Sequence, residues 1–467
     1  MLHDKPCISR RGFLSLGLLF LPRIQSTSTR VEFLNFDRLE PLLGGNRFVL
    51  PMELSGPRDD ARNAWPRWIQ NHDREVRSRL LRGEEDTLVN FVLFGVSFTD
   101  RARVAPESGA SEATARLITE RIQHFIEAIR NPNSDRLTLL NSLVTRLGYG
   151  TAVGVERERL RQYVSQQVSR YLEERQQYRA AVNQSLTNDV ISGNATSRLY
   201  RDRGLSMDTD FRPNYAIEQA LAEIKRRGLL KSVKRAAIVG PGLDFTDKDS
   251  GFDYYPLQTL QPFALIDSLV RLGMARTTDL RVSVFDISPQ VLGHVSQAAA
   301  RARSRQPYTL QLVLDRTPAW NTGALNYWRR LGERIGSNAP PMPVPSQIKN
   351  VDRRAVRIRT EIVTVLDPQS LNIVSQHVEA PAGQRFDLIV ATNIFLYYNR
   401  FEQALALLNI ESMLNAGGVA VSNDLAEDYS GLKLRTVGTV SVPYTPSQAD
   451  QVRIYSTPAF QPQLAPA

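Results

Sequence analysis

Five short apolar runs rich in β-branched residues constrain the fold more than any other feature of this sequence. Each run ends in Asp, Asn or Gly, and helix-like segments separate most of them. Such runs are typical of parallel strands that helices cover on both faces. They read RAAIVGPG, LRVSVFDIS, VRIRTEIVTVLD, RFDLIVATN and GGVAVSND. We therefore predict an α/β fold with a doubly wound, Rossmann-like sheet, to whose edge VGTVSVPY and QVRIYST return as antiparallel strands.

The preceding half of the chain is mainly helical in pattern. ARLITERIQHFIEAIRN carries one apolar stripe with the period of an amphipathic helix. SDRLTLLNSLVTRLGYG begins at Ser134, a good N-cap, and ends at glycines, while VERERLRQYVSQQVSRYLEERQQYRAAV predicts a long helix packed by one face. Prolines interrupt the segments around Trp65 and Trp68, which we expect to be loops or short elements.

The first residues of the chain differ in pattern from the rest, with a pair of arginines before an apolar run. Arg10 and Arg11 directly precede an apolar run that Pro22 closes, which resembles a twin-arginine export signal. A misassigned start or a short anchor is the alternative reading. The pattern predicts export or membrane association through residues 10–22, and a cytoplasmic location if the signal is spurious.

The predicted organisation has four parts and one insertion. The parts are a signal or anchor (1–29), a mainly helical domain (30–228), the sheet domain (229–460) and a tail (461–467), with the insertion at 320–351.

The distribution of charge and the cysteine content argue against some classes of partner and of binding site. The net charge is +10, yet acids and bases are interspersed along the chain, so we do not expect a nucleic-acid partner. Cys7 is the single cysteine and the five histidines are scattered. We therefore expect neither an intramolecular disulfide nor a metal site.

Three of the predicted strands end in residues suited to a ligand. Gly240 and Gly242 end the first strand, where a missing Cβ allows a tight turn and close approach of a ligand. Asp286 ends the second strand, and its two oxygens match the two hydroxyls of a ribose. Asn393 ends the fourth strand with a donor and an acceptor. Since ligands of doubly wound sheets bind beyond the carboxyl ends of the strands, these residues predict one nucleoside site.

The turn after the first strand argues against a dinucleotide. Phe245 stands where the dinucleotide fingerprint has its third glycine, which counts against NAD or FAD. The segment from Gly240 to Asp247 also lacks the Gly-Lys-Ser/Thr of a P-loop. A nucleoside without a pyrophosphate fits better.

Together these features resemble the class I S-adenosylmethionine-dependent methyltransferases. The likeness is closest in FDLIVATNIFLYYNRFEQALALLNIESMLNAGGVAVSND, which is similar to the chemotaxis-receptor methyltransferase group, and it spans about Lys231 to Phe460. The helical half does not match that group's N-terminal domain. The resemblance implies S-adenosylmethionine as the cofactor and a set of contacts to it. These are Gly240 and Gly242 at the methionine part, Asp244 at the amino group, Asp286 at the ribose, Ile287 over the adenine, Asp367 at the adenine amine and Asn393 near the reacting end.

The sequence does not identify the catalytic residues. The inserted segment TDKDSGFDYYPLQTLQP is expected to hang over the mouth of the site. Its acids and phenols, or the phenols beyond Asn393, could remove a proton from the acceptor. These weak candidates are Asp253, Tyr254, Tyr255, Tyr397 and Tyr398, with Asp247 and Lys248 beside them. The alternative is that the tyrosines only pack the insertion against the sheet.

Two classes of function follow. The first is a methyltransferase whose acceptor the sequence does not identify. The second is a non-catalytic nucleoside-binding or scaffold protein that keeps the fold. A nicotinamide oxidoreductase is disfavoured by Phe245. Export would separate the protein from the cytoplasmic methyl donor, whereas the set of Gly240, Gly242 and Asp286 favours the enzyme.

Overall fold

The computed structural model describes residues 30–46, 48–104, 111–151, 154–185, 205, 211–246, 252–424 and 426–458. The expected signal at 1–29, the tail at 461–467, and Asp247 and Lys248 lie outside the described residues. Within the described part of the chain, no helix is both long and apolar enough to cross a bilayer.

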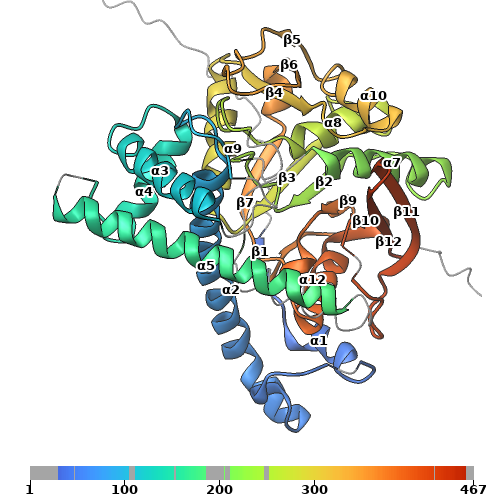
Figure 1. The fold of residues 1–467 in the computed structure, drawn as a ribbon. Coiled ribbons are helices and arrows are strands. Elements are labelled where there is room, and N and C mark those ends of the chain that lie inside the picture. Colours follow the sequence, from blue (N-terminus) through green and yellow to red (C-terminus); the bar gives the residue numbers. More distant parts are fainter. Residues whose placement is uncertain are drawn as a thin grey trace, which may run out of the picture.

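A mostly parallel sheet forms the centre of the described structure (Figure 1). Its seven strands are β2 (Arg235–Val239), β3 (Arg281–Asp286), β7 (Leu366–Ser370), β9 (Phe386–Ala391), β10 (Leu414–Ser422), β11 (Arg435–Thr445) and β12 (Gln448–Ser456). They lie in the order β11-β12-β10-β9-β2-β3-β7. Strand β12 is antiparallel to both β10 and β11, and the other pairs are parallel. The prediction of a doubly wound sheet with antiparallel strands at its edge is confirmed.

The direction of winding reverses between β2 and β9. The chain passes from β2 to β3 and β7 on one side, then returns to β9 and β10 on the other. The last residues of β2 and β9, Val239 and Ala391, are paired. A crevice therefore opens beyond these two strands, at the point where such sheets bind ligands.

Alternate residues of each central strand face two different layers of helices. Ala236 and Ile238 contribute to a core with α7 and α8, whereas Ala237 and Val239 contribute to a core with α12, α1 and the first half of α2. The bounds are α1 (Phe36–Leu43), α2 (Arg58–Phe94), α7 (Arg212–Arg226), α8 (Gln261–Arg271), α9 (Pro289–Arg303) and α12 (Arg400–Met413). The period-two alternation buries both faces, as the continuous apolar runs require.

One predicted strand was wrong. The run VRIRTEIVTVLD does not form a single strand of the main sheet. Its first three residues, 356–358, are the end of β6 (Val351–Ile358), which lies in a separate antiparallel sheet between β4 (Tyr308–Asp315) and β5 (Gly336–Ala339). The run alternates between buried Val356 and Ile358 and exposed Arg357, which is typical of a strand with one buried face. Short helix α11 (Thr360–Val363) then leads into β7, while α10 (Thr322–Arg330) lies between β4 and β5.

The predicted helices of the N-terminal half are present, but one region differs. They are α3 (Glu112–Ala128), α4 (Asp135–Arg146) and α5 (Val155–Ser185), and the Ser134 side chain caps α4 by accepting from the N–H of Leu137. The region of Trp65 and Trp68, expected as loops, lies in the 37-residue helix α2. Trp65 is 1% exposed and donates to the carbonyl of Leu34. This burial and the stacking of the two indole rings stabilise the helix despite Pro66.

Contacts cross the expected domain boundary at residue 228. Strand β1 (Arg30–Phe33) pairs with β8 (Gln376–Glu379), and α1 packs against α12. Helix α7 belongs to the core of the main sheet. The far half of α2 packs with α3, α4 and α5 in a third core, which also includes Leu243 and Phe245 from the loop after β2. Two one-turn 3-10 helices complete the description, η1 (Met52–Leu54) and η2 (Phe395–Tyr397).

Candidate functional site

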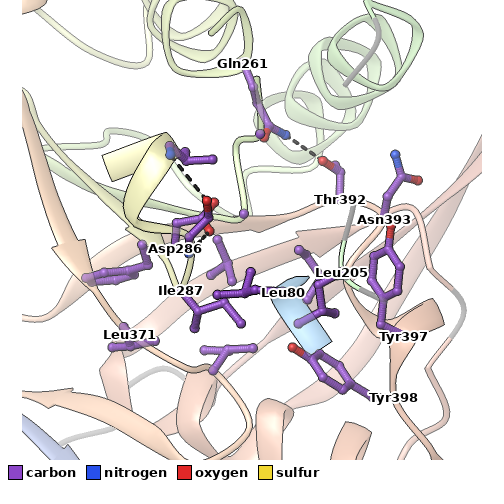
Figure 2. Close-up of a pocket in the computed structure, with 18 residues that line it drawn as sticks. Leu80, Leu205, Gln261, Asp286, Ile287, Leu371, Thr392, Asn393, Tyr397 and Tyr398 are labelled. Carbon is purple, nitrogen blue, oxygen red and sulfur yellow. Dashed lines mark hydrogen bonds between the residues drawn. The ribbon is translucent and has the colours of Figure 1, made fainter. Parts of the chain in front are cut away.

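A cavity that is open to solvent lies beyond the carboxyl ends of β2, β3 and β9 (Figure 2). Five residues singled out from the sequence as cofactor contacts line it: Gly240, Gly242, Asp286, Ile287 and Asn393. Tyr397 and Tyr398 also line it. The sheet topology thus brings together residues that the sequence separates widely.

The two glycines shape the floor of the cavity. Gly240 and Gly242 have φ values of +66° and +67°, a region that other residues adopt at a cost. A Cβ on Gly240 would lie 2.3 Å from Cδ1 of Ile394. The positive φ therefore favours glycine at position 240, whereas the contact with Ile394 involves only the flexible end of that side chain.

Asp286 presents its carboxylate to the cavity at the end of β3. One oxygen accepts a hydrogen bond of 2.8 Å from the N–H of Ser288. Burial raises the pKa of Asp286 to about 7, although the N–H groups of Ser288 and Ile287 oppose this shift. A partner that donates hydrogen bonds to the ionised form would bring the pKa back down.

Asn393 follows β9 in a left-handed conformation, which asparagine adopts more readily than most other non-glycine residues. Its φ is +55°, and the N–H donates to Oδ1 of Asn423 at 2.8 Å. Nδ2 of Asn423 returns a hydrogen bond of 2.9 Å to Oδ1 of Asn393. Beside it, Oγ1 of Thr392 accepts from Nε2 of Gln261 at 2.6 Å (Figure 2). The hydrogen bonds between Asn393 and Asn423 therefore connect the carboxyl ends of β9 and β10 at the mouth of the cavity.

A buried acid holds the next residues of the same loop. Asp424 accepts hydrogen bonds from the N–H groups of Ile394 and Phe395 at 2.7 and 2.8 Å. Burial raises the pKa of Asp424 to about 6, against the effect of these N–H groups. Sequence reasoning missed the roles of Asn423, Asp424, Gln261 and Thr392. The available signal was the Asn-Asp pair that ends GGVAVSND.

The two tyrosines occupy different positions. In Figure 2 the Tyr397 ring points toward Asn393, while Tyr398 lies below Leu80 and Leu205. Tyr398 is 5% exposed, and burial raises its pKa well above the ordinary value, so the phenol stays protonated at neutral pH.

The inserted segment after Phe245 does not line the cavity with the candidates expected from it. The carboxylate of Asp253 accepts from the N–H of Val96 at 3.0 Å and the hydroxyl of Ser97 at 2.9 Å, at the end of α2. Tyr254 and Tyr255 are not among the described residues that line the cavity. These three residues therefore lie outside the described lining of the cavity, and a catalytic role for them stays a prediction.

Asp244 likewise lies outside the described lining of the cavity. Its carboxylate accepts from the hydroxyl of Tyr255 and from Nε2 of Gln258, each at 2.9 Å, and it does not line the cavity. In the structure the half-buried Asp244 thus contacts Tyr255 and Gln258, and its contact with an amino group of the cofactor stays a prediction.

Asp367 lies in the wrong half of its strand for adenine. It is the second residue of β7 and pairs with Ser283, whereas Asp286 at the carboxyl end of β3 pairs with Ser370. Its carboxylate accepts from Nε2 of Gln369 at 2.6 Å and does not line the cavity. The register of the third strand was the source of this error.

The N-terminal half completes the cavity wall. Leu80 of α2 and Leu205 both line it. Gly83 makes this arrangement possible, because a Cβ there would lie only 1.9 Å from the carbonyl oxygen of Leu205. Among the described residues, no group of three or more His, Cys, Asp or Glu side chains could hold a metal ion.

Comparison with known proteins gives only distant structural likenesses. No family model matches the chain, and no curated protein matches it. An N-methyltransferase, NodS, from Bradyrhizobium japonicum, solved with S-adenosyl-L-homocysteine, has 12% identity over 53% of this chain and 90% of its own, with a TM-score of 0.26. Magnesium protoporphyrin IX methyltransferase from Synechocystis has 7% identity over 58% of this chain and 84% of its own, with a TM-score of 0.25. The CurJ carbon methyltransferase has 12% identity over 85% of this chain and 98% of its own, with a TM-score of 0.25. These TM-scores carry no functional argument, so the proposal below rests on the topology and cavity of this chain.

Proposed function

We propose that this chain is an S-adenosylmethionine-dependent methyltransferase of class I that transfers the methyl group by direct displacement from the sulfonium. One arrangement supports this above all. The turn of Gly240 and Gly242, the carboxylate of Asp286 and the amide of Asn393 line one cavity at the reversal point of a doubly wound sheet. Each group matches a different part of a nucleoside that carries an amino-acid chain.

The geometry after β2 favours a nucleoside over a dinucleotide. In dinucleotide sites the pyrophosphate lies at the N-terminus of the helix that directly follows the glycines. Here the next helix, α8, begins only at Gln261, and Phe245 is fully buried against Phe91 with ring centroids 5.9 Å apart. In the described residues a longer connection therefore replaces the tight glycine-to-helix turn of a dinucleotide site, and the first residue of α8, Gln261, lines the same cavity through its side chain.

Six of the lining residues are assigned a part in binding the cofactor. Asp286 accepts both ribose hydroxyls, since a carboxylate has two acceptor oxygens at the right separation. Ile287 and Leu371 flank the adenine, and the open face of Gly240 and Gly242 admits the methionine part. Asn393 lies near the sulfonium end.

Chemistry at that end depends mainly on alignment of the acceptor with the methyl group. The Tyr398 phenol, protonated at neutral pH because burial raises its pKa, acts as a hydrogen-bond donor and not as a base. Tyr397 points toward Asn393 and is the phenol placed to contact the acceptor (Figure 2).

Calorimetric titration of the full chain tests this proposal. S-adenosylmethionine and S-adenosylhomocysteine should both bind with micromolar affinity, and NAD should not. The variant Asp286→Asn should lose about tenfold to a hundredfold in affinity, because hydrogen bonds to a charged group are worth about 1.5–3 kcal/mol. Asp367→Asn is the matched control, since that aspartate lies outside the cavity and should leave the affinity unchanged.

The outcomes separate the two classes of function. Absence of binding by a folded protein would remove the methyltransferase proposal. Binding of both sulfur nucleosides without methyl transfer to a broad panel of acceptors would favour the non-catalytic nucleoside-binding alternative.

A further inference from the structure

Arg136, a residue of the helical half, is bonded to the loop that follows the glycine turn. It is the second residue of α4 and is only 2% exposed. Its guanidinium donates to three backbone carbonyls, those of Asp244, Phe245 and Tyr255, with a distance of 2.7 Å from Nη2 to the oxygen of Asp244. One side chain thus satisfies three acceptors on both arms of the inserted segment.

Further contacts fix the guanidinium in this position. It lies 5.2 Å from the centre of the Tyr255 ring and 5.8 Å from that of Phe245. The two arms that it joins also bond to each other, since the N–H of Asp244 donates to the carbonyl of Gln258 at 2.8 Å. Phe245 is fully buried, so water would not readily replace a lost partner for its carbonyl.

The loop held by Arg136 is continuous with the floor of the cavity. Gly242 lines the cavity, and Asp244 follows two residues later. Gly242 has a positive φ. Glycine in the unfolded chain adopts positive and negative φ about equally, so contacts outside the turn must select the positive value. The bonds of Arg136 to Asp244 and Phe245 provide such a constraint from the C-terminal side of the turn.

We propose that Arg136 is a positioning residue that holds the Gly240–Gly242 turn in its cofactor-binding conformation. This inference rests on the proposed function for its link to the cofactor. It assigns the helical half a role in cofactor binding through a contact that lies outside the cavity. A lysine would not replace the residue, because an ammonium group lacks the planar fork that reaches several carbonyls at once.

Arg121 supplies a matched control. It is also fully buried, lies 5.1 Å from the centre of the Phe98 ring, and donates to backbone carbonyls. Those carbonyls belong to Val92, Gly95, Arg101 and Ala102, so none of them is in the glycine loop. Arg121→Lys and Arg136→Lys therefore remove similar interactions from different places.

The test compares these variants by calorimetry with S-adenosylhomocysteine, well below both melting temperatures. Both substitutions should lower the Tm. Only Arg136→Lys should also weaken binding, by about tenfold or more, because the turn must be reordered at the expense of binding energy. Equal affinities, or equal losses in both variants, would overturn the proposal.

Milder variants and a second readout cover the case in which Arg136→Lys does not fold. Ser134→Ala removes the N-cap of the turn that carries Arg136, and Ser111→Ala removes the equivalent cap of α3. Only Ser134→Ala should weaken binding. Hydrogen exchange at the amides of residues 242–245 should also accelerate in Ser134→Ala alone. That exchange readout needs no cofactor, so it tests the role of Arg136 even if the wild-type protein binds no sulfur nucleoside. Unchanged exchange at residues 242–245 in Ser134→Ala would contradict that role.

Discussion

Asn393 and Asn423 exchange two hydrogen bonds, of 2.8 and 2.9 Å, across the mouth of the cavity. The exchange holds Asn393 at φ +55°, where a non-glycine residue is strained by about 1 kcal/mol. Asn423→Ala should therefore destabilise the protein by about 2–3 kcal/mol, because it removes these two hydrogen bonds and a third, from Nδ2 to the Asp450 carboxylate at 3.1 Å. Chemical denaturation measures this loss.

Asn393→Gly provides the second side of a double-mutant cycle. Glycine adopts the positive φ without strain, so it has less need of Asn423. Asn423→Ala should cost less in the Asn393→Gly background than in the wild type. Equal costs in the two backgrounds would mean that Asn423 does not act through Asn393.

The titration of Asp286 predicts a pH dependence of cofactor binding. Burial raises its pKa to about 7, so below that pH the free protein holds a proton that ribose hydroxyls must displace. Affinity should rise as the pH increases toward about 7, by up to tenfold per pH unit, and level off above it. Calorimetry across this range measures the effect. A flat profile in wild type, or the same slope in Asp286→Asn, would contradict the assignment.

The same shift has a separate consequence for the free protein. Between the ordinary pKa of 3.8 and about 7, folded Asp286 keeps a proton that the unfolded chain has lost. The free energy of unfolding should therefore fall as the pH rises through this window. Asp424, with its pKa raised by burial to about 6, adds a similar slope. Asp286→Asn should reduce the pH dependence of the free energy of unfolding and leave only the part due to Asp424. Denaturation at several pH values measures this dependence. An unchanged pH dependence in Asp286→Asn would contradict the raised pKa of Asp286.

Glu402 joins α2 to the loop that carries the cavity tyrosines. It is 2% exposed and lies 2.8 Å from Nη2 of Arg79 and 3.1 Å from Nε2 of His72. Burial raises its pKa, but His72, Arg79 and the N–H of Asn399 outweigh burial and bring the pKa down to about 2. Glu402→Gln should destabilise the protein by about 3 kcal/mol at pH 7, since it leaves a buried charge without its partner.

The role of Glu402 can be checked in two ways, by the pH dependence of stability and by substitution of its exposed neighbour Glu75. A lowered pKa stabilises above the ordinary value of 4.5, so the difference between wild type and Glu402→Gln should shrink as the pH falls from 4.5 toward about 2. Glu75 contacts the same His72 and Arg79 from an exposed position, at 3.6 and 3.7 Å. Glu75→Gln should change stability by less than about 0.5 kcal/mol. Similar losses for both variants would show that burial of Glu402 is not the cause.

Gly83 predicts a link between packing and the cavity wall. A Cβ there would lie 1.9 Å from the carbonyl oxygen of Leu205, a backbone atom that can yield only by moving the chain. Gly83→Ala should cost about 1–3 kcal/mol by overpacking and should weaken cofactor binding by displacing Leu205 from the wall. Gly56→Ala, whose Cβ would meet nothing within 4 Å, is the control. Unchanged denaturation and affinity in Gly83→Ala would mean that the wall does not depend on this contact.

The main sheet and much of the cavity were predictable because their signals are local. Strand ends at Gly240, Asp286 and Asn393 follow from short apolar runs, and parallel strands bring their carboxyl ends to one edge. The error at β6 was local too. The alternation of Val356, Arg357 and Ile358 was readable as a one-sided strand.

Other parts of the site depend on contacts between distant segments. Leu80 and Leu205 reach the cavity only because α2 packs against the sheet layers. Arg136 and Asp244 lie 108 positions apart in the chain and meet because their segments both pack in the third core. A single sequence gives no signal for such pairs, so the role of the helical half could not be predicted from it.

A crystal structure of the full chain with S-adenosylhomocysteine would locate the cofactor site. We predict that the ribose hydroxyls lie within hydrogen-bond distance of the Asp286 carboxylate, with the adenine beside Ile287 and Leu371. The methionine part should lie over Gly240 and Gly242. A nucleoside bound elsewhere on the protein, or in this cavity with its ribose away from Asp286, would contradict it.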